Sequence, residues 1–507
     1  MTHLLATLQL PPYPGATDLK RLLPELVVGG LFLLLMLADM VVPASRRGLL
    51  AAISVLGYAG AFASVVYAWF DAGDQGALAY NGTFAYDRFS LFVDGIVIAC
   101  GLLVTLISPG YLNRRGLHYG EFYGLIAGSV LGMMLLAGAM NLMIIFLGIE
   151  LLSVALYILS GFAYTEERSQ EAGLKYLLLG GFASGFLLYG MALVYGETGH
   201  TNLSDISRSL TAAGNTTDPL FLIGVSLMLV GFAFKITAAP FHFWSPDVYQ
   251  GAPTNVTTFM SVATKVAAFA ALIRVFTGVF TASFDKWDNF VIFISIVSMV
   301  LGNVAALTQT SLKRMLAYSG IAQAGYILIG VAVNNLSVAT TASLFYLAAY
   351  ASMNLGAFAV ITVMAGRGED IDDYSGLRGL YYRRPYVAVA MALFLFSLGG
   401  FPPTVGFFAK FFVFQAAIQN GQVSLALWGI ATSAVSVYYY LRVGALMFVR
   451  PREGEAGYDW SRTGFLGGTA LLITAAATVA LGVMTQVLLD VSSQAAASLA
   501  NIVVPHS

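Results

Sequence analysis

The sequence predicts an all-α protein that crosses a membrane many times, and three observations support this fold class. The 507 residues are 58% hydrophobic and only 10% charged, whereas soluble domains contain about 25% charged residues. The hydrophobic residues fall in runs of roughly 18 to 30, the length that a helix needs to cross about 30 Å of hydrocarbon. Several runs contain a lysine, which costs about 3 kcal/mol at the centre of a membrane helix and therefore indicates a function.

The hydrophobic runs define about fourteen transmembrane spans, whose ends are placed to within a few residues. The N-terminal stretch MTHLLATLQLPPYPG has neither the basic region nor the small-residue cleavage site of a secretory signal. We therefore expect the first hydrophobic segment, from Leu22, to be a retained helix. The expected spans are 22–42, 48–70, 88–108, 121–139, 142–164, 172–196, 219–243, 254–281, 289–308, 315–333, 338–365, 386–418, 422–449 and 464–489.

The basic residues of the loops predict the orientation. If the N-terminus is outside, most loop arginines and lysines fall inside, as the positive-inside rule requires. We therefore expect both chain ends on the outside. The outer loops then carry only Lys20, Arg21, Arg88, Arg208 and Lys286.

Two spans contain helix-breaking residues. The seventh span contains Pro240, and the twelfth contains a glycine- and proline-rich stretch, 399–403, just before Lys410. Proline removes a backbone hydrogen bond and glycine loosens the helix. Interrupted membrane helices are tolerated where they line a buried or watery cavity. Because the two broken helices, 7 and 12, are an odd number of spans apart, they predict two inverted five-helix repeats.

The predicted repeats divide the chain into four parts. Residues 1–120 form three N-terminal transmembrane helices, and residues 121–281 form the first inverted repeat, helices 4–8. Residues 289–449 form the second inverted repeat, helices 9–13. Residues 450–507 form helix 14 and the tail.

Three lysines inside the spans, Lys235, Lys265 and Lys410, are candidate stations of a proton path. Lys265 is about eleven residues into its span, or roughly 16 Å from its start, which is too deep for the side chain to reach the interface. Arg274 and Arg442 lie toward the ends of their spans. We expect these arginines to extend to the interface in a structural role.

Glu150 is the acidic residue nearest the middle of a central span. Burial disfavours the charged form of a lone carboxyl or amine, but a pair of opposite charges stabilises both. We therefore predict that Glu150 pairs with Lys235 and that the pairing changes how tightly Lys235 holds its proton. A static ion pair is the alternative, although it leaves Lys265 and Lys410 unexplained. Asp39 and Asp94 lie toward span ends or outside the central block, and we expect them to be structural.

The sequence lacks the ligands that redox cofactors need. Cys100 is the one cysteine, so the chain alone cannot hold an iron–sulfur cluster. No histidine lies at the middle of a span, which argues against a haem held by two membrane histidines. There is no GxGxxG motif after a strand and no phosphate-binding P-loop motif. We expect no cofactor in this chain and no nucleic acid partner. The histidines are His3, His118, His200, His242 and His506.

Three stretches resemble the antiporter-like membrane subunits of the proton-pumping NADH:quinone oxidoreductase, respiratory complex I. They are PFHFWSPDVYQGAPTNVTTFMSVATKVAAF (240–269), SLKRMLAYSGIAQAGY (311–326) and FSLGGFPPTVGFFAKFFVF (396–414). The likeness covers about 121–449. The PDVYxGAP portion is more similar to the subunit N (subunit 2) family than to its paralogues L and M. A lysine at position 410 argues against subunit M, and the absence of a long C-terminal lateral helix argues against subunit L.

The resemblance implies fourteen helices, two inverted five-helix repeats and a set of proton-transfer residues. The family's fifth-helix glutamate matches Glu150, and its lysines on helices 7, 8 and 12 match Lys235, Lys265 and Lys410. His242 is a possible accessory residue. Relatives often have a histidine where this chain has Gln323; a glutamine cannot take up a proton, but it can order water.

The resemblance also implies a function and its partners. Electrons would pass from NADH to quinone in other subunits of complex I, including related antiporter-like subunits beside this one, while this chain moves protons across the bilayer. The expected location is the bacterial inner (plasma) membrane rather than a thylakoid-type membrane. The alternatives are a subunit of a multi-subunit cation/proton antiporter and a non-conducting scaffold. Direct quinone catalysis in this chain lacks a supporting motif.

Overall fold

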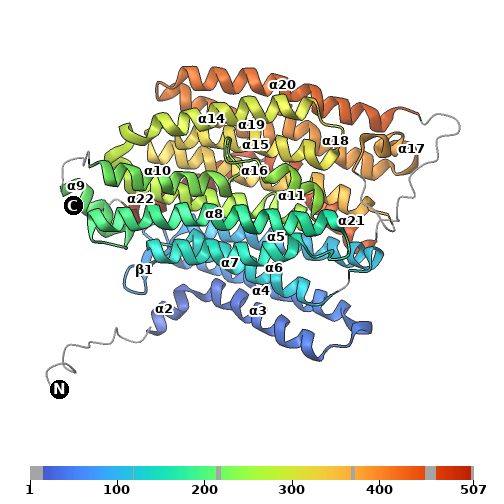
Figure 1. Cartoon of the computed structure of the whole chain (residues 1–507), viewed down its shortest axis with the longest axis horizontal. Helices are drawn as coiled ribbons and strands as arrows, with labels where there is room; N and C mark the ends of the chain where they lie inside the picture. Colours follow the sequence, from blue (N-terminus) through green and yellow to red (C-terminus); the bar gives the residue numbers. More distant parts are fainter. Residues whose placement is uncertain (1–14, 118, 213–217, 367–371, 451–463, 504–507) are drawn as a thin grey trace.

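The computed structural model describes residues 15–117, 119–212, 218–366, 372–450 and 464–503. Most helices run along one common direction (Figure 1). Within these ranges, nine helices are long and apolar enough to cross a membrane. The predicted all-α polytopic fold is therefore confirmed, whereas the count of fourteen spans and the inverted repeats stay predictions. His3, His118 and His506 lie outside the described residues.

The first three predicted spans are helices that pack in sequence order. A β-hairpin that the sequence analysis did not predict joins the second span to the third, with Ala77 paired to Tyr86. Its turn places Asn81 and Gly82 at φ 58° and 81°, a left-handed conformation that asparagine and glycine tolerate. The elements are α2 (Ala16–Arg21), α3 (Leu23–Val41), η1 (Ala44–Arg46), α4 (Gly48–Ala72), β1 (Ala77–Ala79), β2 (Phe84–Tyr86) and α5 (Arg88–Arg115).

The next helices pack closely because glycines meet at their crossings. A Cβ on Gly132 would lie 2.6 Å from the backbone nitrogen of Leu152, so only glycine lets α6 approach α7 this closely. The side chain of Asn141 accepts a hydrogen bond from the backbone N–H of Met143 and caps α7. This block comprises α6 (Glu121–Ala137), α7 (Leu142–Ser160), α8 (Glu167–Thr198), α9 (Leu203–Ala212) and α10 (Pro219–Lys235).

The centre of the chain is a series of short helices. The seventh span ends at Lys235, earlier than predicted, and Thr237 follows with φ 61°. The eighth span was predicted to be one continuous helix. That prediction is wrong, because the helix is interrupted at Ser261 and Val262. The segments are α11 (Ser245–Gly251), α12 (Thr254–Met260), α13 (Ala263–Leu272), the π-helix η2 (Ile273–Val279) and the 3-10 helix η3 (Phe280–Ser283).

The second half repeats the pattern of long and interrupted helices. The twelfth span is interrupted at the predicted place, since α18 ends at Gly399 and α19 begins at Val405. The elements are α14 (Phe284–Leu307), α15 (Leu312–Val331), α16 (Leu336–Met364), η4 (Tyr374–Leu377), α17 (Leu380–Arg383), α18 (Pro385–Gly399), α19 (Val405–Gln419), α20 (Val423–Phe448), α21 (Phe465–Val483) and α22 (Thr485–Val503).

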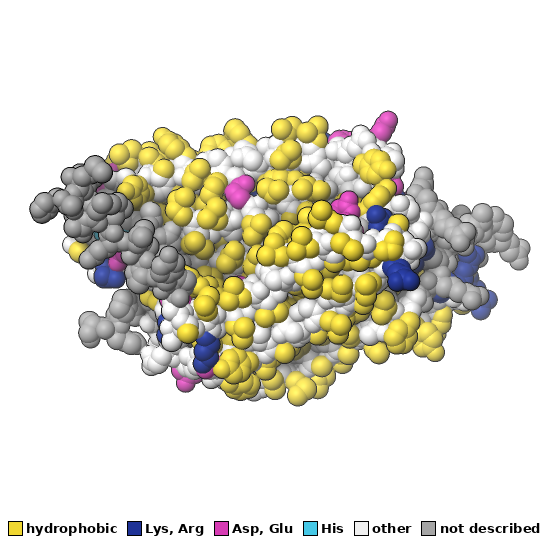
Figure 2. Space-filling model, turned by 90° about the horizontal axis from the view of Figure 1, so that it is seen from below, with side chains coloured by type: hydrophobic (Ala, Val, Ile, Leu, Met, Phe, Trp, Pro, Cys, Tyr) yellow, Lys and Arg dark blue, Asp and Glu magenta, His cyan; other side chains and the backbone are white. Residues whose placement is uncertain are grey.

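Helix α16 lies in the core of the bundle. It packs against α5, α12, α15, α18, α19, α21 and α22, and most of its residues are buried. The outer surface is apolar in turn, since hydrophobic side chains cover the middle of the face in Figure 2 while most Lys and Arg side chains lie toward its ends. This distribution is what a lipid-facing belt between two aqueous sides requires.

Candidate functional site: three buried lysines

Each of the three predicted lysines lies beside an interruption in a helix. Lys235 is the last residue of α10, Lys265 lies at the start of α13, and Lys410 lies shortly after the break between α18 and α19. Their exposed fractions are only 3%, 1% and 4%. Interrupted helices offer free backbone carbonyl groups and room for polar side chains. The interruptions therefore supply the hydrogen-bond partners that a buried lysine needs.

Lys235 contacts helix α7 and a cluster of aromatic rings. Its Nζ donates a hydrogen bond to Ser153 Oγ at 2.6 Å and lies 3.5 Å from the hydroxyl oxygen of Tyr157. The same atom is 5.5 Å from the ring centroid of Tyr157 and 5.7 Å from that of Tyr176. Aromatic faces attract a cation at such distances. These groups stabilise the ammonium form of Lys235 without a carboxylate in contact.

The predicted contact between Glu150 and Lys235 is wrong in this structure. Among the described residues, Lys235 forms no ion pair within 4.0 Å, and the buried Oε1 of Glu150 has no hydrogen-bond partner. The reason is helical spacing: Ser153 lies one turn from Glu150 on the same face of α7 and reaches the lysine first. Glu150 therefore acts on Lys235 across this intervening turn.

Lys265 binds to the backbone of a neighbouring helix. Its Nζ donates a hydrogen bond to the carbonyl oxygen of Gly320 on α15 at 2.6 Å, and it lies 5.6 Å from the ring centroid of Tyr350 on α16. Tyr350 also donates to the carbonyl oxygen of Ser261 at 3.1 Å, and Asn354 donates to Ser261 Oγ at 3.1 Å. Two side chains of α16 thus form hydrogen bonds with polar groups of Ser261, where the helix is interrupted before Lys265.

Lys410 uses the break in its own span. Its Nζ donates to the carbonyl oxygen of Gly399, at the end of α18, at 3.1 Å, and to Ser433 Oγ on α20 at 2.8 Å. It lies 5.1 Å from the ring centroid of Tyr326. A Cβ on Gly400, whose φ is 83°, would lie 3.1 Å from the Lys410 Cδ atom. The glycines of this stretch therefore both end α18 and leave space for the lysine.

One face of α15 connects Lys265 to Lys410. Gly320 accepts the hydrogen bond of Lys265, Tyr326 places its ring beside Lys410, and Gln323 lies between them. Residues three apart share one side of a helix. The two lysines therefore interact with successive turns of the same helix.

Gln323 is the centre of a polar cluster on this face. Its Nε2 donates to the carbonyl oxygen of Leu398 at 3.2 Å and to the hydroxyl oxygen of Tyr440 at 3.3 Å. Its Oε1 accepts a hydrogen bond from the hydroxyl of Tyr346. Tyr440 in turn shares a hydrogen bond with Ser319. The cluster orders hydroxyl groups between the two lysines, although Gln323 cannot itself take up a proton.

His242 lies apart from the lysines, in the turn between α10 and α11. Its Nδ1 is buried and has no hydrogen-bond partner among the described residues, and it forms no hydrogen bond with Lys235, Lys265 or Lys410. Gln323 thus lies on the face of α15 that contacts Lys265 and Lys410, whereas His242 lies in the turn after α10, and the roles of both stay predictions.

The two membrane arginines differ. Arg442 extends outward and lies 5.4 Å from the ring of Tyr374, as expected for a side chain at an interface. Arg274 does not reach the interface, and that prediction is wrong. It is completely buried in η2 and forms a bidentate ion pair with Asp87. Its Nη1 lies 2.9 Å from Oδ2 and its Nη2 lies 3.1 Å from Oδ1 of the aspartate. The pair explains why this arginine can remain inside the bundle.

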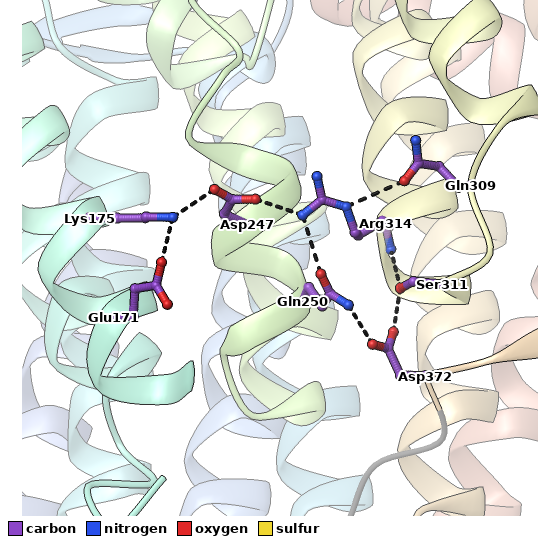
Figure 3. A network of polar contacts seen from close by, with 8 residues as sticks. All are labelled: Glu171, Lys175, Asp247, Gln250, Gln309, Ser311, Arg314 and Asp372. Atoms are coloured by element: carbon purple, nitrogen blue, oxygen red, sulfur yellow. Dashed lines mark hydrogen bonds and ion pairs between the residues drawn. The ribbon is translucent and has the colours of Figure 1, made fainter. Parts of the chain in front are cut away.

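A second polar network, which we name the inner clamp, lies at the end of the bundle that the loop charges place inside (Figure 3). Asp247 on α11 accepts hydrogen bonds from Lys175 at 2.8 Å and from Arg314 at 2.6 Å. The network as a whole joins α8 and α11 to α15 and to the segment before η4. The members of the inner clamp are Glu171, Lys175, Asp247, Gln250, Gln309, Ser311, Arg314 and Asp372.

Sequence reasoning missed the uncharged partners of the lysines. They are Ser153, Tyr157, Tyr176, Gly320, Tyr326, Tyr350 and Ser433. For Ser153 and Tyr157 a signal was present, because both lie on the face of α7 that carries Glu150. For Gly320 and Ser433 nothing local distinguishes them from other small residues in a membrane helix.

Comparison with known proteins identifies the family. Residues 139–436, more than half of the chain, match the family model described as NADH:quinone oxidoreductase/Mrp antiporter, transmembrane. The chain belongs to this family. The NADH-quinone oxidoreductase subunit N of Trichlorobacter lovleyi is 42% identical over 478 residues, which is 94% of this chain and 97% of the relative. The predicted likeness to the subunit N family is therefore confirmed.

Solved structures agree with this family. A chain of respiratory complex I from Thermus thermophilus, solved with bound aureothin, has a TM-score of 0.77 at 33% identity. The match covers 92% of this chain and 98% of that one. A chain of the Mrp complex from a Dietzia species has a TM-score of 0.81 at 23% identity and shares the fold, with 95% and 97% covered. The protein is an antiporter-like membrane subunit.

Proposed function

We propose that this chain is a proton-translocating subunit of NADH:quinone oxidoreductase and that Lys235, Lys265 and Lys410 carry the protons. The observation that carries the proposal is that all three are buried beside helix interruptions and form no ion pair among the described residues. A purely structural lysine would be expected to pair with an acid. Hydroxyl, carbonyl and aromatic partners instead hold the ammonium group while leaving its proton free to move.

The free energy of one hydrogen bond to a lysine is similar to the free energy needed to pump one proton. Moving one proton against 100 mV costs about 2.3 kcal/mol, which equals a pKa change of roughly 1.7 units at 1.36 kcal/mol per unit. One hydrogen bond to a charged group contributes about 1.5 to 3 kcal/mol. A movement that breaks one bond, such as that from Lys265 to Gly320, is therefore large enough to release a proton.

Glu150 and the inner clamp supply the expected coupling. The charge of Glu150 acts on Lys235 across one turn of α7 and raises the free energy needed to deprotonate it. The inner clamp joins α8 and α11 of the first predicted repeat to α15 of the second. The packing of α6 on α7 and of α14 on α15 supports the proposal that these halves are inverted repeats.

The proposed setting of the chain is a respiratory complex in a bacterial membrane. Electrons pass from NADH to quinone in other subunits of the complex, and we propose that the redox cofactors belong to those subunits. The partners are neighbouring membrane subunits, related antiporter-like subunits among them. The membrane is the inner membrane of a bacterium. The organism of the 42% identical relative supports this last step.

The proposal is tested with Lys235→Ala in the assembled complex. Proton pumping into vesicles and the quinone reductase rate are measured together, with Lys286→Ala, an exposed lysine beside Asp285, as the matched control. We expect the Lys235 variant to assemble and to lose both activities at least tenfold, and the control to keep them. Wild-type pumping by the Lys235 variant would favour a scaffold. Transport of Na⁺ by the chain in isolation would favour a cation/proton antiporter.

A further inference from the structure

A group of buried charges, which shares no hydrogen bond or ion pair with the three lysines in the described chain, lies at the end of the bundle that the loop charges place outside. Glu25 lies at the start of α3, Asp94 lies near the start of α5, and Asp87 caps α5. The exposed fractions of these side chains are 5%, 0% and 0%. Arg274 reaches this group from η2. The group thus joins the three N-terminal helices to the helix that continues from Lys265.

The charges in this group do not balance. Arg274 is the cation that acts on Asp94, and both of its terminal nitrogens are bound to the two oxygens of Asp87. Asp87 also accepts a hydrogen bond from the backbone N–H of Ser90 at 2.8 Å. The charge of Asp87 is therefore neutralised by Arg274, and both of its oxygens accept hydrogen bonds. Among the described residues, Glu25 and Asp94 have no cation paired with them.

Glu25 and Asp94 interact mainly with each other. No hydrogen-bond donor in the described chain reaches either oxygen of Asp94 or the Oε2 atom of Glu25, whereas the two carboxyl groups act directly on one another. Two adjacent carboxylates cannot both remain ionised in a dry interior, and one proton between them removes the repulsion. No group of three metal-ligating side chains occurs among the described residues, and the adjacent arginine repels a metal ion.

Tyr86 lies near this pair without a hydrogen bond to it, and its hydroxyl group is hydrogen-bonded to the exposed surface. The charge of Glu25 acts on the hydroxyl group of Tyr86, and Tyr86 donates a hydrogen bond to Asp71 Oδ2 at 3.0 Å. Asp71 is 30% exposed and forms an ion pair with the exposed Lys20 at 2.7 Å. Proton transfer through Tyr86 requires Glu25 to move into hydrogen-bond contact with its hydroxyl group. The transfer is then balanced, because Tyr86 gives its proton to Asp71, accepts one from Glu25 and ends unchanged.

We propose that Glu25 and Asp94 form a proton-binding site that holds a proton between two carboxyl groups and passes protons through Tyr86 and Asp71 to the outer surface. The structural role expected for Asp94 from the sequence does not explain a buried carboxyl with unpartnered oxygens. The release step rests on the proposed proton-translocating function. The binding of the proton by the pair does not.

The bound proton is tested by infrared spectroscopy on the assembled complex at neutral pH. The double variant Glu25→Gln/Asp94→Asn keeps the shapes of both side chains and removes both acids. We expect the wild type minus variant spectrum to contain the carbonyl band of a protonated carboxyl group, which shifts in D₂O. The absence of this band would overturn the site. If the double variant does not assemble, Asp94→Asn alone gives the same measurement through the shift of the Glu25 band.

The release step is tested by proton pumping. We expect Asp94→Asn to lower the number of protons pumped per electron pair at least twofold and Asp94→Glu to restore it. Asp285→Asn, an exposed acid paired with Lys286 at the start of α14, is the matched control and should leave pumping unchanged. Wild-type pumping by Asp94→Asn would overturn the relay. If the Lys235 variant pumps normally while the infrared band is present, the proposed function fails and the proton-binding site stands.

Discussion

Gly320→Ala is the substitution that most sharply tests the contact between Lys265 and α15. A Cβ at this position would lie 2.8 Å from Lys265 Nζ and 3.1 Å from the hydroxyl oxygen of Tyr350. The distance to Nζ is shorter than such contacts allow and the distance to the tyrosine oxygen is tight, so the flexible end of the lysine must move away. The movement breaks the 2.6 Å hydrogen bond to the Gly320 carbonyl oxygen.

The size of the effect follows from that one bond. A hydrogen bond to a charged group contributes about 1.5 to 3 kcal/mol, or roughly one to two pKa units at 1.36 kcal/mol per unit. We therefore expect proton binding at Lys265 to weaken by about 10- to 100-fold. Assembly should persist, because the atoms nearest to the new methyl group are ends of side chains rather than backbone atoms.

The assay compares proton pumping and quinone reduction by the complex in sealed vesicles. Gly444→Ala on α20 is the matched control, since a Cβ there meets no atom within 4 Å. We expect Gly320→Ala to lower pumping at least tenfold at neutral pH and the control to pump normally. Equal pumping by both variants would refute the claim that the Gly320 carbonyl controls the proton of Lys265.

The remaining predictions concern three other charged groups. Glu150→Gln should lower pumping about tenfold in the same vesicle assay, because Lys235 loses the attraction of a nearby charge, which is less than about 4 kcal/mol for a charge beyond 4 Å at an effective dielectric constant of about 20; unchanged pumping would contradict the coupling. Burial raises the pKa of Asp247, but hydrogen bonds from Lys175 and Arg314 outweigh it and hold that pKa below its ordinary value. The inner clamp should therefore stabilise the protein above the ordinary carboxyl pKa and lose this contribution as the pH falls through the lower pKa of the folded state. Thermal unfolding curves recorded at decreasing pH measure this loss of stability, and Asp247→Asn should remove it. An unchanged loss of stability in the variant would show that Asp247 is not its source. Arg274→Ala should destabilise the complex by about 3 to 5 kcal/mol because it leaves Asp87 buried and unpaired, and Asp87→Asn in the same chain should recover most of the assembly seen on native gels; no recovery would mean that the arginine acts through other contacts.

The membrane fold and the lysines were predictable because the bilayer constrains the sequence so strongly. Hydrocarbon requires long apolar helices, so their places are visible in the sequence, and a lysine inside such a run is conspicuous. The interruption of span twelve was equally visible, because glycines and prolines cluster there. The Asn81-Gly82 pair also signalled a hairpin turn, but the short strands around it carried too little pattern to be recognised.

The features that were not predicted depend on contacts between distant segments. The break at Ser261 has no proline or glycine, and side chains of α16 stabilise it. Glu150 was expected to touch Lys235, but the rotation of α7 presents Ser153 instead. The pairing of Arg274 with Asp87 joins residues that are far apart in the chain. Helix orientation and long-range pairing cannot be read from local sequence.

The most direct test of the central claim is the number of protons pumped per electron pair by the complex with Lys265→Ala. The account predicts an assembled complex in which pumping and coupled quinone reduction both fall at least tenfold, while Lys286→Ala behaves as wild type. Wild-type values of both activities in the Lys265 variant would contradict the account, because the proton path would then bypass the centre of this chain.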